Sequence, residues 1–348
     1  MALPAAGQSA DEVRRGRALA FPRDHGSHPG ARTEWWYLTG WLGTEAAPTQ
    51  GFQVTFFRSR TGLADDLAGR LAPRQLLFAH AALTDLAGRR HLHDQRLLRW
   101  NGDADDDARA GAARDDTRVW IADWQLRHES GSYRTAIVAD GWALDLACAT
   151  VQPLLLQGDA GFSRKGPMEA QASHYYSWPQ LAVQGQPTLA GRGQPARGRA
   201  WLDHEWSEAI LAPDAVGWDW IGFNLFDGSA LTAFVLRRAD GSTLWAGGSH
   251  RSAAGALRVF GATDLAWTPQ RHWRSPATGA RYPVELALDS PAGRFGVRAL
   301  LDAQELDGGR STGTVYWEGL SELLDAGGRR IGLGYLEMTG YAGPRLRL

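Results

Sequence analysis

Apolar and polar residues alternate with a period of two at many places along this chain. The pattern is clear in residues 51–57 (GFQVTFF), 284–288 (VELAL) and 295–301 (FGVRALL). Because successive side chains of an extended strand point to opposite faces, this alternation predicts strands with one buried face. Asp-Gly turn signals separate the segments at short intervals, which is typical of antiparallel hairpins. Helical patterning is scarce, with residues 11–19 as the best short candidate, so we expect a nearly all-β chain.

The length of 348 residues exceeds the size at which a single hydrophobic core usually stops growing, which favours two domains. Residues 184–198 (QGQPTLAGRGQPARG) are rich in Gly, Pro and polar side chains and lie just past the middle. Such a stretch is typical of a linker. We therefore expect an N-terminal arm over 1–21, a first domain over 22–183, a linker over 184–198 and a second domain over 199–348.

The charge of the chain excludes several classes of partner. With 37 basic and 38 acidic residues the net charge is −1, so no long-range field attracts nucleic acid or an anionic membrane surface. No apolar run approaches the length of a membrane span, and the first twenty residues lack an apolar signal core. Cys148 stands alone, so it forms no intramolecular disulfide and gives no information on the compartment.

The chain has 16 Trp beside 8 Tyr and 11 Phe. This number of large flat side chains has two interpretations, both open at this point. Tryptophan can fill wide cores and domain interfaces, or it can line a cavity that binds an apolar ligand.

Several catalytic signatures are absent. There is no Gly-x-Ser-x-Gly nucleophile elbow, and residues 204–208 (HEWSE) lack the second His of a zinc-protease helix. The chain has no Walker loop or dinucleotide fingerprint, so we expect no cofactor. The pairs His25/His28 and His91/His93 have ligand-like spacing, but without Cys or a third fixed ligand they do not predict a metal site.

Dense polar and aromatic clusters mark the chain instead. They are residues 25–29 (HGSHP), 34–37 (EWWY), 80–85 (HAALTD), 173–177 (SHYYS), 201–206 (WLDHEW), 218–220 (WDW), 316–319 (YWEG) and 334–341 (GYLEMTGY). At these positions, from about residue 22 to 343, the chain resembles the carotenoid 1,2-hydratase/AttH-like family. The resemblance implies two lipocalin-like antiparallel β-barrel or sandwich domains packed against each other. It also implies a periplasmic or secreted protein, although a cytoplasmic location stays open.

The chemistry of hydration sets requirements on the site that such a protein would have. Adding water across an isoprenoid double bond requires protonation of carbon to give a tertiary cation. The site therefore needs a carboxylic acid kept protonated by burial, and aromatic faces that stabilise the cation. A His or Tyr within hydrogen-bond reach would hold the water.

Strand geometry restricts which residues can cooperate. In an extended segment Asp203 and Glu205 share one face, whereas His204 and Trp206 share the other. By the same rule Asp219 points away from its two Trp neighbours, and Glu34 shares a face with Trp36. We expect His204, Trp206 and Asp219 inside the cavity, with Tyr175 or Tyr176 nearby.

The candidate site residues fall into two groups. The candidate catalytic residues are Asp219, His204, Glu205, Asp203 and Tyr176. The candidate substrate-binding residues are Trp206, Trp218, Trp220, Glu34, Trp36, Tyr37, His28, His80 and Tyr175. The alternative is that these acids, histidines and indoles form a hydrogen-bonded network that only joins the two barrels.

Three functions are consistent with these features. The first is a hydratase or related isomerase that acts on a terpenoid or other lipophilic substrate, as the resemblance implies. The second is a non-catalytic carrier of a lipophilic ligand, associated with an exporter. The third is a secreted hydrolase, which the family label suggests but no nucleophile motif supports. In each the partner is a hydrophobic small molecule rather than nucleic acid, and the oligomeric state stays open.

Overall fold

The computed structural model describes residues 11–62, 72–102, 109–209 and 211–342. Nearly every regular element is a strand, and the short 3-10 turn η1 (Arg23–His25) precedes them all. The helix expected over residues 11–19 is wrong, because that segment forms turns and irregular backbone. None of the described helices is long and apolar enough to cross a membrane.

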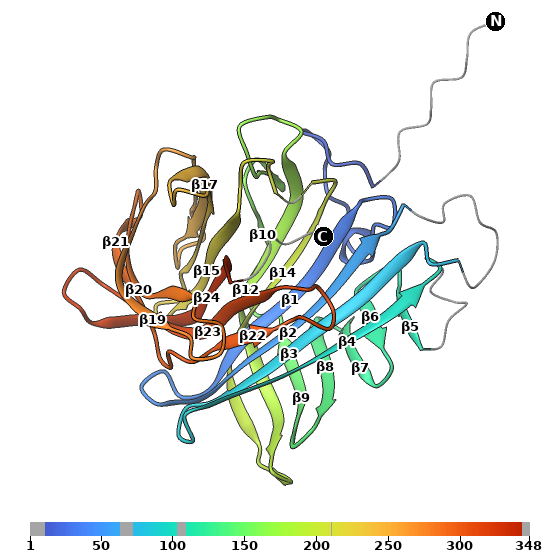
Figure 1. Cartoon of the computed structure of the whole chain (residues 1–348), viewed down its shortest axis with the longest axis horizontal. Coiled ribbons are helices and arrows are strands. Elements are labelled where there is room, and N and C mark those ends of the chain that lie inside the picture. The colour runs from blue at the N-terminus through green and yellow to red at the C-terminus, as the bar shows by residue number, and fades with distance from the viewer. Residues whose placement is uncertain (1–10, 63–71, 103–108, 210, 343–348) are drawn as a thin grey trace, which may run out of the picture.

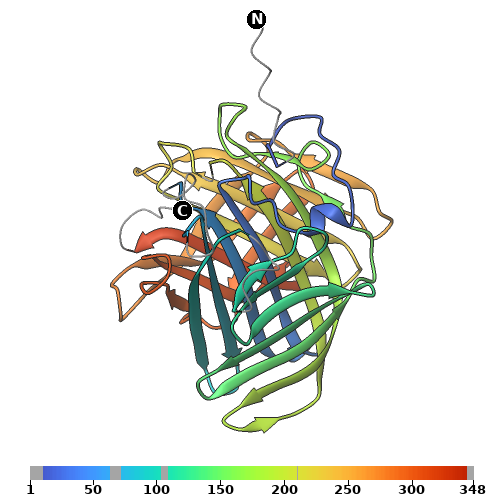
Figure 2. The same cartoon turned by 90° about the vertical axis from the view of Figure 1, so that its right-hand side faces the viewer.

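Among the described residues, fourteen strands form the first antiparallel sheet, along the path β4-β3-β2-β1-β14-β12-β9-β8-β7-β6-β5, with β10, β11 and β13 paired to β12. Its strands are β1 (Thr33–Gly43), β2 (Pro48–Arg60), β3 (Gln75–Asp85), β4 (Arg90–Trp100), β5 (Ala110–Ala112), β6 (Arg118–Ile121), β7 (Trp124–Glu129), β8 (Ser132–Ala139), β9 (Trp142–Ala149), β10 (Leu155–Leu156), β11 (Phe162–Arg164), β12 (Ala172–Leu189), β13 (Arg192–Gly193) and β14 (Ala196–Ser207). The sheet curls until its end strands β4 and β5 lie side by side, which makes a nearly closed barrel (Figures 1 and 2).

In the described part of the chain, ten strands form the second antiparallel sheet, along the path β18-β17-β16-β15-β24-β23-β21-β20-β19, with β22 paired to β23. Its strands are β15 (Gly217–Leu225), β16 (Ala230–Arg237), β17 (Thr243–Arg251), β18 (Leu257–Phe260), β19 (Ala266–Arg274), β20 (Arg281–Ser290), β21 (Gly293–Ala299), β22 (Glu305–Asp307), β23 (Val315–Leu324) and β24 (Arg330–Ala342). This sheet is a curled half-barrel that packs beside the first (Figure 1). The all-β, two-sheet prediction is confirmed.

Three large apolar clusters of the described residues fill this arrangement. One occupies the inside of the barrel and includes Trp36, Trp100 and Trp206. A second lies in the half-barrel around Trp317. The third combines side chains of both sheets, among them Trp41, Trp201, Trp220 and Tyr335. Much of the tryptophan therefore serves as core and interface, which was one of the two open interpretations.

The segment expected as the linker, residues 184–198, belongs to the first sheet. It contains the end of β12, a tight turn at Ala190 and Gly191, and the start of β14. Ala182 to Gly185 pair with both β14 and β9. Gly, Pro and polar residues suit an exposed hairpin tip as well as they suit a linker, which explains the difference. The chain passes from the first sheet to the second between Ser207 and Gly217.

This topology predicts the outcome of cutting the chain at the hairpin tip. A protease site inserted after Gly191 would be cleaved in an exposed turn, while β14 stays hydrogen-bonded between β1 and β12. We expect the two fragments to co-elute as one species in size-exclusion chromatography and to separate only in denaturant. Separation into two folded halves under native conditions would show that residues 184–198 act as a linker.

Candidate functional site

Strand β14 presents two sets of polar side chains on its opposite faces. In register across the sheet, His204 lies between Trp36 of β1 and Tyr176 of β12. The next residue, Asp203, lies between Tyr37 and Ser177. The first row points into the barrel, where Trp36 and Tyr176 join its core, whereas Tyr37 joins the cluster between the two sheets. The alternation predicted from the sequence is therefore present.

The inward set is a buried network centred on Glu34. Its Oε1 accepts hydrogen bonds from His28 Nδ1 at 2.7 Å and from His204 Nε2 at 2.9 Å. Its Oε2 accepts one from Arg58 Nε at 2.8 Å. Burial alone would raise the pKa of Glu34, but the charges of His28 and Arg58 hold it well below its ordinary value. Glu34 is therefore an ionised carboxylate inside the barrel.

The hydrogen bonds of His28 fix its protonation state. The ring nitrogens of His28 face carboxylate oxygens on both sides, Glu34 at 2.7 Å and Asp24 at 3.0 Å. Both nitrogens must donate, so the ring is an imidazolium, and it stacks on Trp206 with centroids 3.6 Å apart. Burial would raise the pKa of Asp24, but hydrogen bonds from His28 and from the Ala20 amide lower it to about 2.

His204 is neutral, because burial disfavours the charged form of its ring. Its Nε2–H donates to Glu34, so its Nδ1 accepts the hydroxyl proton of Tyr176 at 2.9 Å. The Tyr176 oxygen in turn accepts from His25 Nδ1 at 2.8 Å. Burial lowers the pKa of His204, which agrees with a neutral ring. These side chains satisfy one another and tie the segment before β1 into the top of the barrel.

The same network contains the one group of donor atoms that could hold a metal ion in the described parts of the chain. One atom each from His28, Glu34 and His204 lies within 4.8 Å of the others. However, these atoms are already joined by hydrogen bonds, and the Arg58 guanidinium binds the same carboxylate. A cation would have to displace two N–H protons beside a fixed positive charge. The three side chains are therefore arranged for hydrogen bonds with one another and not for metal ligation.

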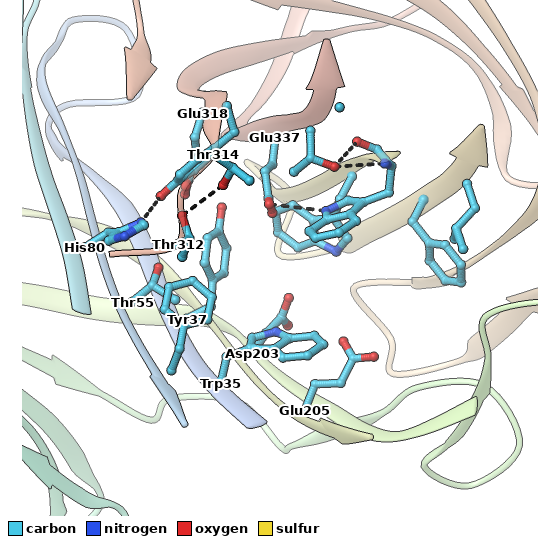
Figure 3. Close-up of a pocket in the computed structure, with 18 of the residues that line it drawn as sticks. Trp35, Tyr37, Thr55, His80, Asp203, Glu205, Thr312, Thr314, Glu318 and Glu337 are labelled. Atoms are coloured by element: carbon cyan, nitrogen blue, oxygen red, sulfur yellow. Dashed lines mark hydrogen bonds between the residues drawn. The ribbon is translucent and has the colours of Figure 1, made fainter. Parts of the chain in front are cut away.

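The outward face of β14 lines a pocket between the two sheets. The pocket has an empty volume of about 1140 Å³, mouth included. The lining residues labelled in Figure 3 come from β1, β2, β3 and β14 on one side and from β23, β24 and the segment before β23 on the other. The large apolar side chains that line it are Trp35, Phe57, Trp218, Trp220, Phe234 and Leu236.

Two glutamates face each other in this pocket. Glu318 of β23 and Glu337 of β24 are direct register partners, and both line the pocket. Glu318 Oε1 is buried without a hydrogen-bond partner among the described residues, whereas Glu337 Oε1 accepts from Trp218 Nε1 at 3.2 Å. Burial and the nearby Glu337 raise the pKa of Glu318 well above its ordinary value. Burial and neighbouring carboxyls raise the pKa of Glu337 to about 8.

Asp203 is a third acid in the pocket wall. It accepts hydrogen bonds from Tyr175 at 2.7 Å, Ser177 at 2.5 Å and Trp201 Nε1 at 2.6 Å. Burial raises its pKa to about 7 although all three hydrogen bonds oppose the rise. The Tyr175 hydroxyl also accepts from Trp220 Nε1 at 3.2 Å, which connects Asp203 to the second sheet.

Glu205 differs from Asp203 because it forms an ion pair. Its Oε1 lies 2.9 Å from Lys165 Nζ and also accepts the hydroxyl of Ser173. Lys165 is the only lysine of the chain. The pocket thus contains one ion pair together with three acids whose pKa values are raised.

His80 and Tyr316 join the two sheets at another side of the pocket. His80 Nδ1 lies 2.7 Å from the Tyr316 hydroxyl, and its Nε2 lies 2.6 Å from Ser311 Oγ. The Gln95 amide donates to Asp307, so its oxygen accepts the Ser311 proton. His80 Nε2 therefore donates to Ser311, and Nδ1 accepts from Tyr316. Burial lowers the pKa of His80 to about 4, in agreement with a neutral ring.

Asp219 lies outside the pocket, contrary to the prediction. Its neighbours Trp218 and Trp220 line the pocket, so the alternation along β15 turns Asp219 to the other face. There it pairs with Arg237 Nε at 3.1 Å and accepts from Tyr341 at 3.1 Å. Burial raises the pKa of Asp219 to about 6, and Arg237 opposes the rise. Its contacts are those of an ion pair within the second sheet.

Apart from Asp219, the structure divides the predicted site residues into two groups. Those that line the pocket are Asp203, Glu205, Tyr37, His80, Trp218 and Trp220, and Tyr175 stands behind Asp203. Those inside the barrel are His204, Tyr176, Trp206, Glu34, Trp36 and His28. The expectation that His204 and Trp206 face the cavity is wrong, because alternation shows which residues share a face but not which face meets the second sheet.

The sequence prediction missed Glu318, Glu337, Lys165 and Tyr316. Two signals could have found them. Each glutamate is the one acid of a family motif, residues 316–319 and 334–341. Lys165 is the only lysine among 37 basic residues, but the sequence alone gave no reason to assign it a role.

The fold and the pocket define a class of protein with two curled β-sheets and an acid-rich, tryptophan-lined site between them. The chain belongs to the AttH-like family, whose model matches residues 12–341. A candidate AttH of Nitrosomonas europaea is 44% identical, with a TM-score of 0.86 over 95% of this chain and 99% of that one.

Two more distant structures share the fold. Kievitone hydratase of Nectria haematococca has a TM-score of 0.68 at 14% identity, over 95% of this chain and 94% of its own. CghA has a TM-score of 0.54 at 13% identity, over 90% of this chain and 89% of its own. The comparison with curated proteins gives no match.

The raised pKa of Glu337 predicts a stability that falls as pH rises. Between its ordinary value of 4.5 and about 8 the folded chain keeps a proton that the unfolded chain releases. The contribution of Glu337 to the free energy of unfolding of wild type should therefore be lost between about pH 5 and about pH 8. In Glu337→Gln we expect this loss to shrink by more than about 1.4 kcal/mol, the value of one pKa unit. Urea unfolding measures it, and parallel curves for both proteins would contradict a raised pKa.

The barrel network predicts a large effect of removing its central charge. Glu34→Gln leaves the buried His28 imidazolium and Arg58 without their common partner. We expect it to lower the free energy of unfolding by about 3–5 kcal/mol. The matched control Glu129→Gln, on an exposed strand end, should change it by less than about 0.5 kcal/mol. A Glu34 variant as stable as this control would show that the network carries little stability.

Proposed function

We propose that this protein is a hydratase that adds water to a C=C bond of a terpenoid or other lipophilic substrate in the pocket between the two sheets. The observation that carries the proposal is the register pair Glu318 and Glu337, two carboxyls opposed across β23 and β24. Their burial and mutual repulsion keep a carboxylic acid protonated at neutral pH, which is the reagent that protonation of an alkene needs.

Glu337 is the better placed of the two as the acid. It is partly exposed to the pocket, whereas Glu318 is 2% exposed. The Glu337 O–H bond breaks as a C–H bond forms at the less substituted alkene carbon, which leaves a tertiary cation. The oxygen of a water molecule bonds to the cation, and a water proton returns to the Glu337 carboxylate. The sum is one water added, with the acid regenerated.

The pocket walls supply the stabilisation that a cation requires. The indoles of Trp35, Trp218 and Trp220 line the space, and ring faces attract a cation more strongly away from bulk water. Trp218 also donates to Glu337, so one side chain contacts the proposed acid and the cavity together. Loss of a proton from a different carbon of the same cation would give isomerisation instead of hydration.

Tyr316 is placed to hold the water. Its hydroxyl proton is donated to His80, so its remaining lone pairs can accept a hydrogen bond from a water in the pocket. The fold that this chain shares with kievitone hydratase supports a hydratase, although a likeness at 14% identity concerns the fold alone.

A carrier of a lipophilic ligand is the second candidate, and the aromatic lining favours it. A hydrolase has less support. Ser311 is hydrogen-bonded to His80, but the serine donates its proton to Gln95 and the histidine donates to the serine. His80 is therefore not arranged as a base for Ser311, which also does not line the pocket.

Turnover of a substrate panel tests the proposal. Prenylated phenols and linear terpenes incubated in ¹⁸O-water should give a product heavier by one labelled water in mass spectrometry. Glu337→Gln keeps the shape of the side chain and removes the acid, so we expect turnover to fall about 10²- to 10⁴-fold with the substrate still bound.

The matched control is Glu285→Gln, whose carboxylate pairs with Arg271 outside the pocket, and it should keep wild-type turnover. Full activity of Glu337→Gln would contradict the assignment of the acid. Binding of the panel by wild type without any product would favour the carrier.

A further inference from the structure

Lys165 holds a position that the proposed hydration leaves unused. It is the only lysine of the chain, and its side chain, 11% exposed, lines the pocket. It follows β11 directly, and its amide donates to the Gln171 carbonyl, so the backbone at this point is tied back to the start of β12. The ammonium group is thus brought to the pocket by a fixed segment of the first sheet.

Three contacts hold the ammonium in place. Nζ lies 2.9 Å from Glu205 Oε1, 4.6 Å from the centroid of the Tyr175 ring and 4.2 Å from that of Phe234. An ion pair combined with two ring faces restrains a side chain that is otherwise flexible. An ammonium has three N–H donors, and among the described residues its one polar contact is the ion pair with Glu205. Two donors therefore remain for a bound molecule.

Lys165 lies toward one end of the pocket. In Figure 3 Glu205, its partner, lies on the opposite side from His80, with Asp203 and Glu337 between them. Phe234 lines both this pocket and a neighbouring cavity that Tyr175 also lines, so the ammonium sits at the wall between the two. A ligand group that contacts Lys165 would therefore lie at one end of the pocket, and the middle of the same ligand would lie beside Asp203 and Glu337.

We propose that Lys165 binds a neutral oxygen acceptor, such as a ketone or ester carbonyl, at one end of a lipophilic substrate. The proposal rests on the proposed function, in which the alkene of the same molecule lies against Glu337. Glu205 already neutralises the charge of Lys165, so a second anion would meet Glu205 and the neighbouring Asp203 without a free cation to balance it. A hydrocarbon would leave the two donors without a partner.

Three probes with one carbon skeleton test this selectivity. Methyl farnesoate carries a neutral carbonyl, farnesoic acid carries a carboxylate, and farnesene has no oxygen. Their dissociation constants can be measured by quenching of tryptophan fluorescence, because three indoles line the pocket. We expect the ester to bind about tenfold or more tightly than farnesene, the effect of a hydrogen bond to a charged donor. At neutral pH the acid should bind more weakly than the ester.

Variants of Lys165 distinguish the effect of its hydrogen-bond donors on binding from the effect of its size. Lys165→Met keeps the apolar stem and should bring the ester to the affinity of farnesene while farnesene binding stays unchanged. Lys165→Arg keeps donors and charge and should retain part of the preference. Lys165→Met leaves the Glu205 carboxylate unpaired, which could destabilise the fold. The double variant Lys165→Met/Glu205→Gln removes that charge and should show the same loss of the preference for the ester. Arg271→Met, which breaks an ion pair outside the pocket, is the matched control.

The uniqueness of Lys165 gives a second readout that needs no turnover. Reductive methylation can modify this ammonium, and mass spectrometry separates it from the α-amine of the chain. Saturating methyl farnesoate should slow methylation of Lys165 at least fivefold and leave the α-amine unaffected.

The outcomes distinguish the two proposals. Equal affinity for ester and farnesene, an unchanged preference in Lys165→Met, or unprotected methylation would overturn the role of Lys165 alone. Failure of all three probes to bind would contradict the lipophilic pocket and with it the proposed hydration.

Discussion

The alternation of side chains along one central strand, β14, determines how this molecule is organised. Asp203 and Glu205 point to the second sheet, while His204 and Trp206 point into the barrel. Because both neighbours, β1 and β12, are paired with it in register, a slip by one residue would exchange the two sets. One strand thus places an ionised, fully paired network on one side and acids with raised pKa values on the other.

The two sides differ in how their charges are compensated. Inside the barrel the charges of Glu34 and Asp24 are balanced by His28, Arg58 and Arg17. In the pocket Glu318 and Glu337 face each other, and no cation of the described residues is among the groups that shift their pKa values. Burying two like-charged groups together is unfavourable. Such a pair is therefore usually found where function requires it. We therefore interpret the network as the support that holds β14 rigid, and the opposed glutamates as the reactive feature that this support positions.

The sequence predicted the strand-rich architecture and the sharing of faces, because both follow from a local period of two. It could not show which face of β14 meets the second sheet, since that depends on the docking of strands far away in the chain. Asp219 looked like a candidate as an acid between two tryptophans, but its partner Arg237 lies across the β15–β16 pair. Likewise Glu318 and Glu337 become a pair only through the register of β23 and β24, and Lys165 reaches Glu205 only in the folded barrel.

The central claim is that Glu337 carries a proton at neutral pH in the pocket. Infrared difference spectroscopy of wild type against Glu337→Gln measures this directly, because a protonated carboxyl and a carboxylate absorb in separate regions. A carboxylic acid band present at neutral pH, absent in the variant and titrating near the pKa of about 8 is the predicted result. A difference spectrum that shows only a carboxylate at neutral pH would contradict it, and the pocket would then lack the acid that hydration requires.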